Sequence, residues 1–396
     1  MSMLRLPLFL ALLLSLGGCS TLSSPITSLF EGESEGSSET ATPQEGAQQA
    51  AGETTNMPDG GLEIAWGADV DQRRPLSPYS FASPDVAGEL IVLAGQDSYA
   101  HIFDTRGNEL RRVALVAASD SGATALSDKL VVLGDAQGIL YGIDPQAGSI
   151  AWRWQMPTVM LGRPVPIADD MLVQTGDNSL YRVNRNGEKL WSFSSAQAGM
   201  SMNLTPSPLV KGDTCYALLS NGDAVALRGD NGDLIWRRQL LLDNDAAVLS
   251  ELKTPMADPV IAGDVLVTAF YQGAIIALSA RNGQQLWQRE LSLKSAPLVM
   301  GGRLFIATAD GAVFELDPTT GATLWKRELE SGELVGPTLL GNRLLVADDA
   351  GEVFALSLDG HVTGTTSLPG RVDRKPVSAP GGALLRNNLG GLYLIR

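Results

Sequence analysis

The stretch GAVFELDPTTGATLW, from Gly311 to Trp325, carries the strongest structural signal in the chain. It joins an apolar run of strand type, a turn containing Asp and Gly, and a second run that ends in Trp. Close relatives of this stretch are GILYGIDPQAGSIAW at Gly138–Trp152 and GAIIALSARNGQQLW at Gly273–Trp287. Four further copies are looser, and the residues at their Trp position are Arg111, Trp191, Trp236 and Gly364.

A second recurring piece, a tight polar turn followed by an apolar run, precedes each of these stretches. Together the two pieces supply four short strands in about 40 residues, which is a typical length for one propeller blade. A single four-stranded sheet cannot bury both of its faces, whereas radially stacked sheets bury face on face. The eight copies of the second piece begin at Val86, Leu126, Ile167, Val210, Ile261, Met300, Leu340 and Ala379.

The two ends of the repeat region complement each other. The last copy ends with its third strand, at residues 391–396, and lacks a strand bearing Trp. A matching strand, LEIAW, stands at residues 62–66. We therefore expect an all-β, eight-bladed β-propeller over residues 62–396, with four antiparallel strands per blade and a ring closed by the N-terminal strand.

The Trp residues recur at one position per blade. This regularity favours packing between neighbouring blades over stacking on a ligand. We expect each Trp→Ala change to cost about 3–5 kcal/mol of stability.

Residues with catalytic potential are few, and each has a structural explanation. Cys215 lies in a strand-like run and is expected to be a small buried hydrophobe. His101 aligns with aromatic residues of other repeats, and His361 belongs to a turn. Asp144 and Asp317 precede Pro at matching turns, which favours a turn role over an acid pair. No phosphate loop, nucleophile elbow or metal-ligand spacing occurs, so we expect no catalytic residue, cofactor or metal.

The N-terminus resembles that of a bacterial lipoprotein. Arg5 precedes an apolar run at residues 6–16, too short to span a membrane, and small residues then lead to Cys19. The resemblance implies a signal peptide at residues 1–18 and a lipidated Cys19. Ser20 stands where Asp would favour the inner membrane. We therefore expect lipid anchoring at the outer membrane, on its periplasmic face.

Residues 19–61 are rich in Ser, Glu, Gln, Thr, Gly and Ala and contain little that could be buried. This composition predicts a disordered acidic tether. The formal net charge of the whole chain is −15, which argues against nucleic-acid binding because phosphate recognition needs a basic surface.

The blade stretches resemble the repeats of pyrroloquinoline-quinone dehydrogenases, which are eight-bladed propellers that bind quinone and metal through long inserts. The present chain has few inserts. With its lipobox, tether and bare ring, the chain resembles the BamB family, propeller lipoproteins of the outer-membrane β-barrel assembly machinery. That resemblance implies a non-catalytic scaffold that binds the periplasmic POTRA domains of the barrel subunit BamA and assists outer-membrane protein folding. Unfolded outer-membrane proteins are a further possible partner. The alternatives are a quinone-dependent dehydrogenase and a periplasmic ligand-binding propeller.

Departures from the repeat period predict the partner surface. The longest spacing contains residues 240–258, and the preceding connection, residues 195–206, places methionines in a loop with no evident core to fill. Exposed Met suits a protein interface, although capping of the blade ends is the alternative. In the BamB family these two connections contact BamA, and Asn203 and Lys253 depart from the charges expected there. The predicted partner-binding residues are Met200, Met202, Asn203, Glu251, Lys253 and Asp258.

Overall fold

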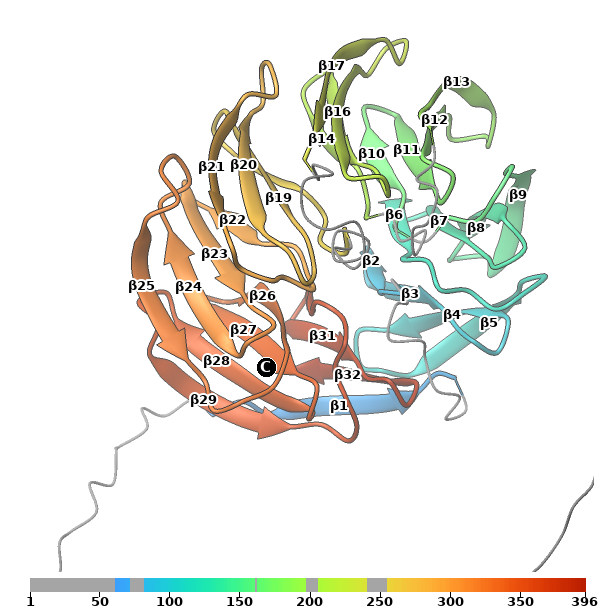
Figure 1. Cartoon of the computed structure of the whole chain (residues 1–396). Helices are drawn as coiled ribbons and strands as arrows, with labels where there is room; N and C mark the ends of the chain where they lie inside the picture. Colours follow the sequence, from blue (N-terminus) through green and yellow to red (C-terminus); the bar gives the residue numbers. More distant parts are fainter. Residues whose placement is uncertain (1–60, 72–81, 161, 197–205, 241–254) are drawn as a thin grey trace, which may run out of the picture. The chain divides into compact units, whose positions relative to one another are not determined.

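The structure is a computed structural model that describes residues 61–71, 82–160, 162–196, 206–240 and 255–396. These residues form eight four-stranded antiparallel sheets arranged in a ring (Figure 1). In each sheet the four strands pair in the order inner, second, third and outer. The eight-bladed β-propeller predicted from the repeats is thus confirmed.

The strand bounds follow the repeat. The inner strands are β2 (Asp85–Ala87), β6 (Thr124–Ser127), β10 (Val165–Ile167), β14 (Leu209–Lys211), β18 (Val260–Ala262), β22 (Leu298–Met300), β26 (Leu334–Leu340) and β30 (Val377–Ala379). The second strands are β3 (Leu90–Ala94), β7 (Leu130–Gly134), β11 (Asp170–Thr175), β15 (Thr214–Leu218), β19 (Val265–Ala269), β23 (Arg303–Ala307), β27 (Arg343–Asp348) and β31 (Gly382–Arg386). The third strands are β4 (Tyr99–Asp104), β8 (Ile139–Asp144), β12 (Ser179–Val183), β16 (Asp223–Arg228), β20 (Ile275–Ser279), β24 (Ala312–Leu316), β28 (Glu352–Ser357) and β32 (Gly391–Ile395). The outer strands are β5 (Glu109–Ala114), β9 (Ser149–Gln155), β13 (Lys189–Ser194), β17 (Leu234–Gln239), β21 (Gln285–Arg289), β25 (Thr323–Glu328), β29 (Val362–Ser367) and β1 (Ile64–Asp69).

We number the blades 1 to 8 by their inner strands β2, β6, β10, β14, β18, β22, β26 and β30. Blade 8 takes its outer strand, β1, from the N-terminus, and β1 pairs antiparallel with β32. Glu63 and Arg396 exchange two backbone hydrogen bonds next to this pairing. The predicted closure of the ring is therefore confirmed.

The Asp-containing turns join third and outer strands. Asp317 Oδ1 accepts hydrogen bonds from the backbone N–H groups of Thr319 and Thr320, and Gly321 follows with φ of +72°. Asp144 makes the same bonds in blade 2. Such a positive φ suits glycine. The predicted turn role of both aspartates is confirmed.

The tryptophans of the repeat join neighbouring blades. Trp236 of blade 4 donates its indole N–H to the carbonyl of Ala280 in blade 5 at 3.0 Å. The ring lies over Gly283, where an added Cβ would come within 2.7 Å of the indole. The same pair of contacts recurs for Trp66 with Gly107, Trp152 with Gly187, Trp191 with Gly232, Trp287 with Gly321 and Trp325 with Gly360.

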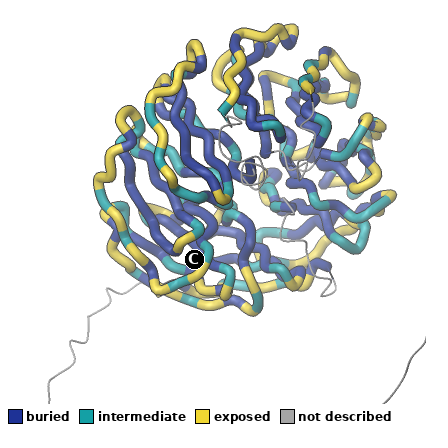
Figure 2. The backbone as a smooth tube through the Cα atoms, in the orientation of Figure 1, coloured by how far each residue is buried: buried dark blue, intermediate teal, exposed yellow. Residues whose placement is uncertain are grey.

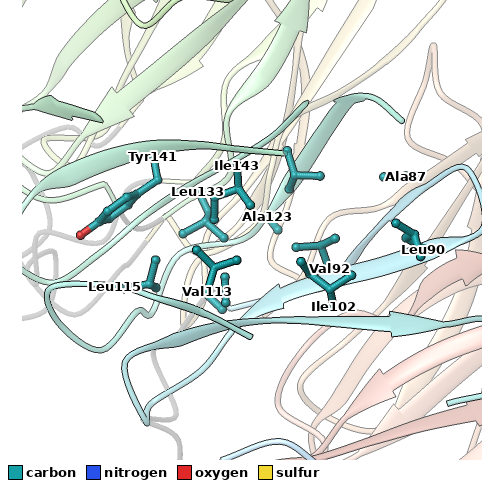
Figure 3. Close-up of a cluster of buried hydrophobic side chains, with 13 residues drawn as sticks. Ala87, Leu90, Val92, Ile102, Val113, Leu115, Ala123, Leu133, Tyr141 and Ile143 are labelled. Carbon is teal, nitrogen blue, oxygen red and sulfur yellow. The ribbon is translucent and has the colours of Figure 1, made fainter. Parts of the chain in front are cut away.

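The hydrophobic core lies between blades. One cluster combines residues of blade 1, such as Val92 and Ile102, with residues of blade 2, such as Leu133 and Ile143 (Figure 3). Figure 2 shows that buried residues lie in the middle strands of the blades and exposed residues at the blade edges.

Two titratable residues are confirmed as parts of this interior. Cys215 is fully buried in β15, and burial raises the pKa of its thiol to about 12. His101 is also fully buried and stacks on Phe103, as its alignment with aromatic residues predicted. Its two ring nitrogens also lie 2.6 Å from Glu109 and 3.0 Å from Asp97, which its alignment with apolar rings did not predict. His361 lies exposed next to the turn that joins β28 and β29.

In the ranges described, no helix is long and apolar enough to cross a membrane.

Candidate binding face and central pocket

The strand order gives the ring two different faces. Neighbouring strands are antiparallel and run from inner to outer, so every connection between blades returns on the same face as the turns between second and third strands. We call this the connection face. The opposite face carries the other two turns of each blade and is called the hairpin face.

Most of the predicted partner-binding residues lie outside the described residues. Met200, Met202 and Asn203 belong to residues 197–205, and Glu251 and Lys253 belong to residues 241–254. Cys19, the predicted signal peptide and residues 19–60 of the predicted tether also lie outside the described residues. Both partner-binding segments are connections between blades, from blade 3 to 4 and from blade 4 to 5. Their described ends therefore stand next to each other on the connection face.

A polar network fixes the point at which the first segment leaves the ring. Asn178, in the β11–β12 turn, is buried and accepts a hydrogen bond from the Ser220 N–H at 2.8 Å. Its side-chain amide donates to the carbonyl of Ala196 at 3.2 Å. Asn221, in the β15–β16 turn, donates to the same carbonyl at 3.1 Å. These bonds join blades 3 and 4 and hold the last described residue before the first segment.

Asp258 is the one predicted partner-binding residue that the structure describes. Its Oδ1 accepts a hydrogen bond from the Ser207 N–H at 2.6 Å, just before β18 begins. Burial raises the pKa of its carboxyl. The side chain lines a pocket at the axis of the ring. Contact between Asp258 and a partner stays a prediction. The contacts that the structure gives for its side chain are with Ser207 and with the pocket.

The pocket has a volume of about 470 Å³ and is lined by residues at and just before the inner strands of seven blades. It therefore lies at the connection-face end of the central channel. Ser83, Ser207 and Met256, which stand near the beginnings of three described ranges, are among the lining residues.

A sequence signal that the repeat analysis missed marks this pocket. In six blades the inner strand begins just after an X-Pro pair, and the residue before the proline lines the pocket. Proline restricts that residue to extended conformations and suits the start of an edge strand, because it has no N–H to donate. The residues before proline in these six blades are Ser83, Arg163, Ser207, Asp258, Ala296 and Lys375.

The side chain of Lys375 extends from blade 8 to blade 6 at the mouth of the channel. Its ammonium group donates to the carbonyls of Ala296 at 2.9 Å and Pro297 at 3.1 Å, both in blade 6. Burial lowers the pKa of Lys375 to about 8.

Other charges around the pocket are paired. The Lys294 ammonium lies 2.8 Å from Glu333 and 3.7 Å from Asp373. Arg163 lies 3.6 Å from Asp85. Within the described ranges, no group of three His, Cys, Asp or Glu side chains is placed to hold a metal ion.

The sequence of this chain is similar to those of a known protein family. Residues 96–327 and 310–389 match the family model described as outer membrane protein assembly factor BamB. The protein of that name from Bordetella pertussis is 26% identical over 348 residues, covering 87% of this chain and 89% of the relative. That from Burkholderia pseudomallei is 23% identical over 85% of this chain and 88% of the relative. The match to the Yersinia pestis protein is 26% identical but spans only 44% of that relative.

Solved structures agree on the fold. The crystal structure of BamB from Moraxella catarrhalis has a TM-score of 0.74, with 17% identity over 85% of this chain and 99% of the other. A europium-containing methanol dehydrogenase gives a TM-score of 0.67 with 11% identity over 84% of this chain and 93% of the other. At these identities the structures show a shared propeller and nothing about chemistry. The sequence family is decided by the family match, which extends over most of the ring: the chain belongs to the outer membrane protein assembly factor BamB family.

Proposed function

We propose that this protein is a non-catalytic scaffold lipoprotein of the outer-membrane β-barrel assembly machinery. It binds the periplasmic POTRA domains of the barrel subunit BamA and assists folding and insertion of outer-membrane proteins. The observation that carries this proposal is the family match over residues 96–389, which spans nearly all of the propeller. Cys19 anchors the protein by lipid to the periplasmic face of the outer membrane.

The connection face of blades 3 to 5 is the proposed contact with BamA. Two observations support this choice of face. The two longest departures from the repeat period, residues 195–206 and 240–258, leave this face from adjacent blades. Asn178 and Asn221 both donate hydrogen bonds to the carbonyl of Ala196, the last described residue before the first of these segments.

Groups that would suggest catalysis have other roles among the described residues. Cys215 is buried, and its raised thiol pKa keeps it protonated at neutral pH. His101 lies inside blade 1 between two carboxylates, away from the central pocket. The lining residues that the structure describes include no aromatic side chain that could stack on a quinone.

Affinity purification from outer membranes tests the proposal. The full-length lipoprotein carrying a C-terminal tag is extracted in mild detergent, and the bound proteins are identified. We expect the barrel subunit to be recovered with it. Recovery of no assembly subunit, together with quinone-dependent alcohol oxidation by the purified protein, would replace the scaffold with the dehydrogenase alternative.

A further inference from the structure

The central pocket has the size of a small-molecule site and an unusual distribution of charge. A volume of about 470 Å³ falls within the roughly 300–1,000 Å³ typical of ligand pockets. Its lining contains four cationic side chains and two carboxylates, in a chain whose net charge is −15. The charged lining residues are Arg163, Lys294, Arg374, Lys375, Asp258 and Asp373.

Lys375 forms no ion pair within 4 Å among the described residues. The hydrogen bonds of its ammonium group go to two neutral carbonyls, so two of its three donors are engaged. Asp258 faces the same pocket and its charge favours the protonated form of Lys375, yet its Oδ1 accepts a hydrogen bond from the Ser207 N–H at 2.6 Å and the two side chains form no ion pair within 4 Å. Burying an ammonium group without a close ion pair is unfavourable. Burial, together with the nearby positive charge of Arg163, lowers the pKa of Lys375 in spite of Asp258.

Arg163 extends this positive region toward solvent. Its guanidinium is about one-third exposed and lies 3.6 Å from Asp85, a distance longer than that of a hydrogen-bonded pair. A second anion can therefore approach the same guanidinium, which offers five donors. Lys294, by contrast, is already engaged by Glu333 at 2.8 Å.

We propose that the central pocket binds a small aliphatic polycarboxylate, held by Lys375 and Arg163. The ligand adds negative charge next to Lys375 and accepts charge-assisted hydrogen bonds from the ammonium group. The rest of the lining is largely Pro, Val, Leu, Met and Ser, which suits a compact aliphatic anion. Among the described lining residues none is aromatic, so these residues offer a flat ring system no stacking partner.

Substitution of Asp258 distinguishes an anionic ligand from a zwitterionic one. A bound carboxylate is repelled by a carboxylate in the same pocket, so Asp258→Asn should strengthen binding. A zwitterionic ligand would instead use Asp258 to hold its ammonium group, and Asp258→Asn would weaken its binding. The two variants Lys375→Met and Asp258→Asn should therefore change the affinity for an anion in opposite directions.

Isothermal titration of the purified full-length protein with citrate at low ionic strength measures this directly. We expect saturable binding that weakens with added salt, falls about tenfold or more in Lys375→Met, and rises in Asp258→Asn. Lys129→Met removes one exposed cation outside the pocket and should leave the affinity unchanged. Circular dichroism verifies that each variant is folded, and if Lys375→Met is not, Arg163→Gln should still show weaker binding.

Absence of saturable citrate binding to the wild-type protein would overturn the proposal. So would unchanged affinity in both Lys375→Met and Arg163→Gln, or weaker binding in Asp258→Asn. None of these outcomes bears on association with the assembly machinery, because the titration contains no other protein.

Discussion

Leu62 occupies the place beside Gly364 that a tryptophan fills in six other blades. An added Cβ at Gly364 would lie 3.1 Å from the Leu62 backbone nitrogen and 3.5 Å from its side chain. Leu62 is buried in the cluster that joins blades 7 and 8. The missing tryptophan of blade 7 and the N-terminal closing segment are therefore two parts of one packing arrangement.

Leu62→Ala should lower the free energy of unfolding by about 2–5 kcal/mol, because it removes a buried side chain from the closure of the ring. Ile64→Ala, two residues further along but with a side chain 39% exposed, should cost much less. Urea denaturation followed by circular dichroism compares the two variants. Equal losses would show that Leu62 has no special role in closing the ring.

Removal of the whole closing strand should have a larger effect. Deletion of residues 62–70 exposes the edge of β32 and should destabilise the ring as a unit. Deletion of residues 31–55, in the predicted tether, should leave the melting temperature nearly unchanged. A variant lacking residues 62–70 that melts like the parent would contradict the closure.

Trp236→Ala tests the contacts that join blades. The indole is 8% exposed, bonds to the Ala280 carbonyl and covers Gly283, so we expect a loss of about 3–5 kcal/mol. Trp236→Phe keeps much of the packing and loses the hydrogen bond, with an expected cost of about 1 kcal/mol beyond the packing change. Equal effects of the two substitutions would mean that the ring over Gly283 contributes little.

Lys375 should give the protein a distinctive dependence of stability on pH. Its pKa of about 8 in the folded state lies below the value of 10.5 expected when it is exposed. Between these values the unfolded state binds more protons, so stability rises with pH through this window. The wild-type protein should gain up to about 1.4 kcal/mol per pH unit relative to Lys375→Met from pH 8 to 10. Denaturation of both proteins at several pH values measures the difference, and a constant difference would refute the burial of a charged Lys375.

Cys19→Ala should release the protein into the soluble periplasmic fraction without changing its melting temperature, because the anchor and the propeller are predicted to be separate. Fractionation of cells that express the variant tests this. Sedimentation of the variant with outer membranes at the wild-type level would contradict a lipid anchor at Cys19.

The repeat was sufficient to predict the ring, since each Trp and each Asp-Gly turn recurs with the period of one blade. Closure could also be predicted, because the strand missing from the last blade is present at residues 62–66. The partner of Gly364 could not be predicted, since a missing side chain leaves no signal of what replaces it.

The central pocket could not be predicted from the sequence for a related reason. Its residues come from seven blades, and none of them is unusual alone. The X-Pro pairs that begin the inner strands were visible, but only the ring geometry brings Lys375 next to Ala296, which lies 79 residues earlier in the chain. For the same reason Asp258 could be assigned to a connection between blades but not to the channel mouth.

We propose that this propeller is a scaffold that binds BamA through the connection face. The most direct measurement is the affinity of the purified protein for the isolated POTRA domains, compared between the wild type and a variant carrying Met200→Glu and Met202→Glu. A variant carrying His361→Gln, on the hairpin face, is the matched control. We predict that the wild type and the His361→Gln variant bind equally, whereas the double variant fails to bind and melts at nearly the wild-type temperature. Wild-type affinity in the folded double variant would contradict the proposed face, and no binding by the wild-type protein would contradict the scaffold itself.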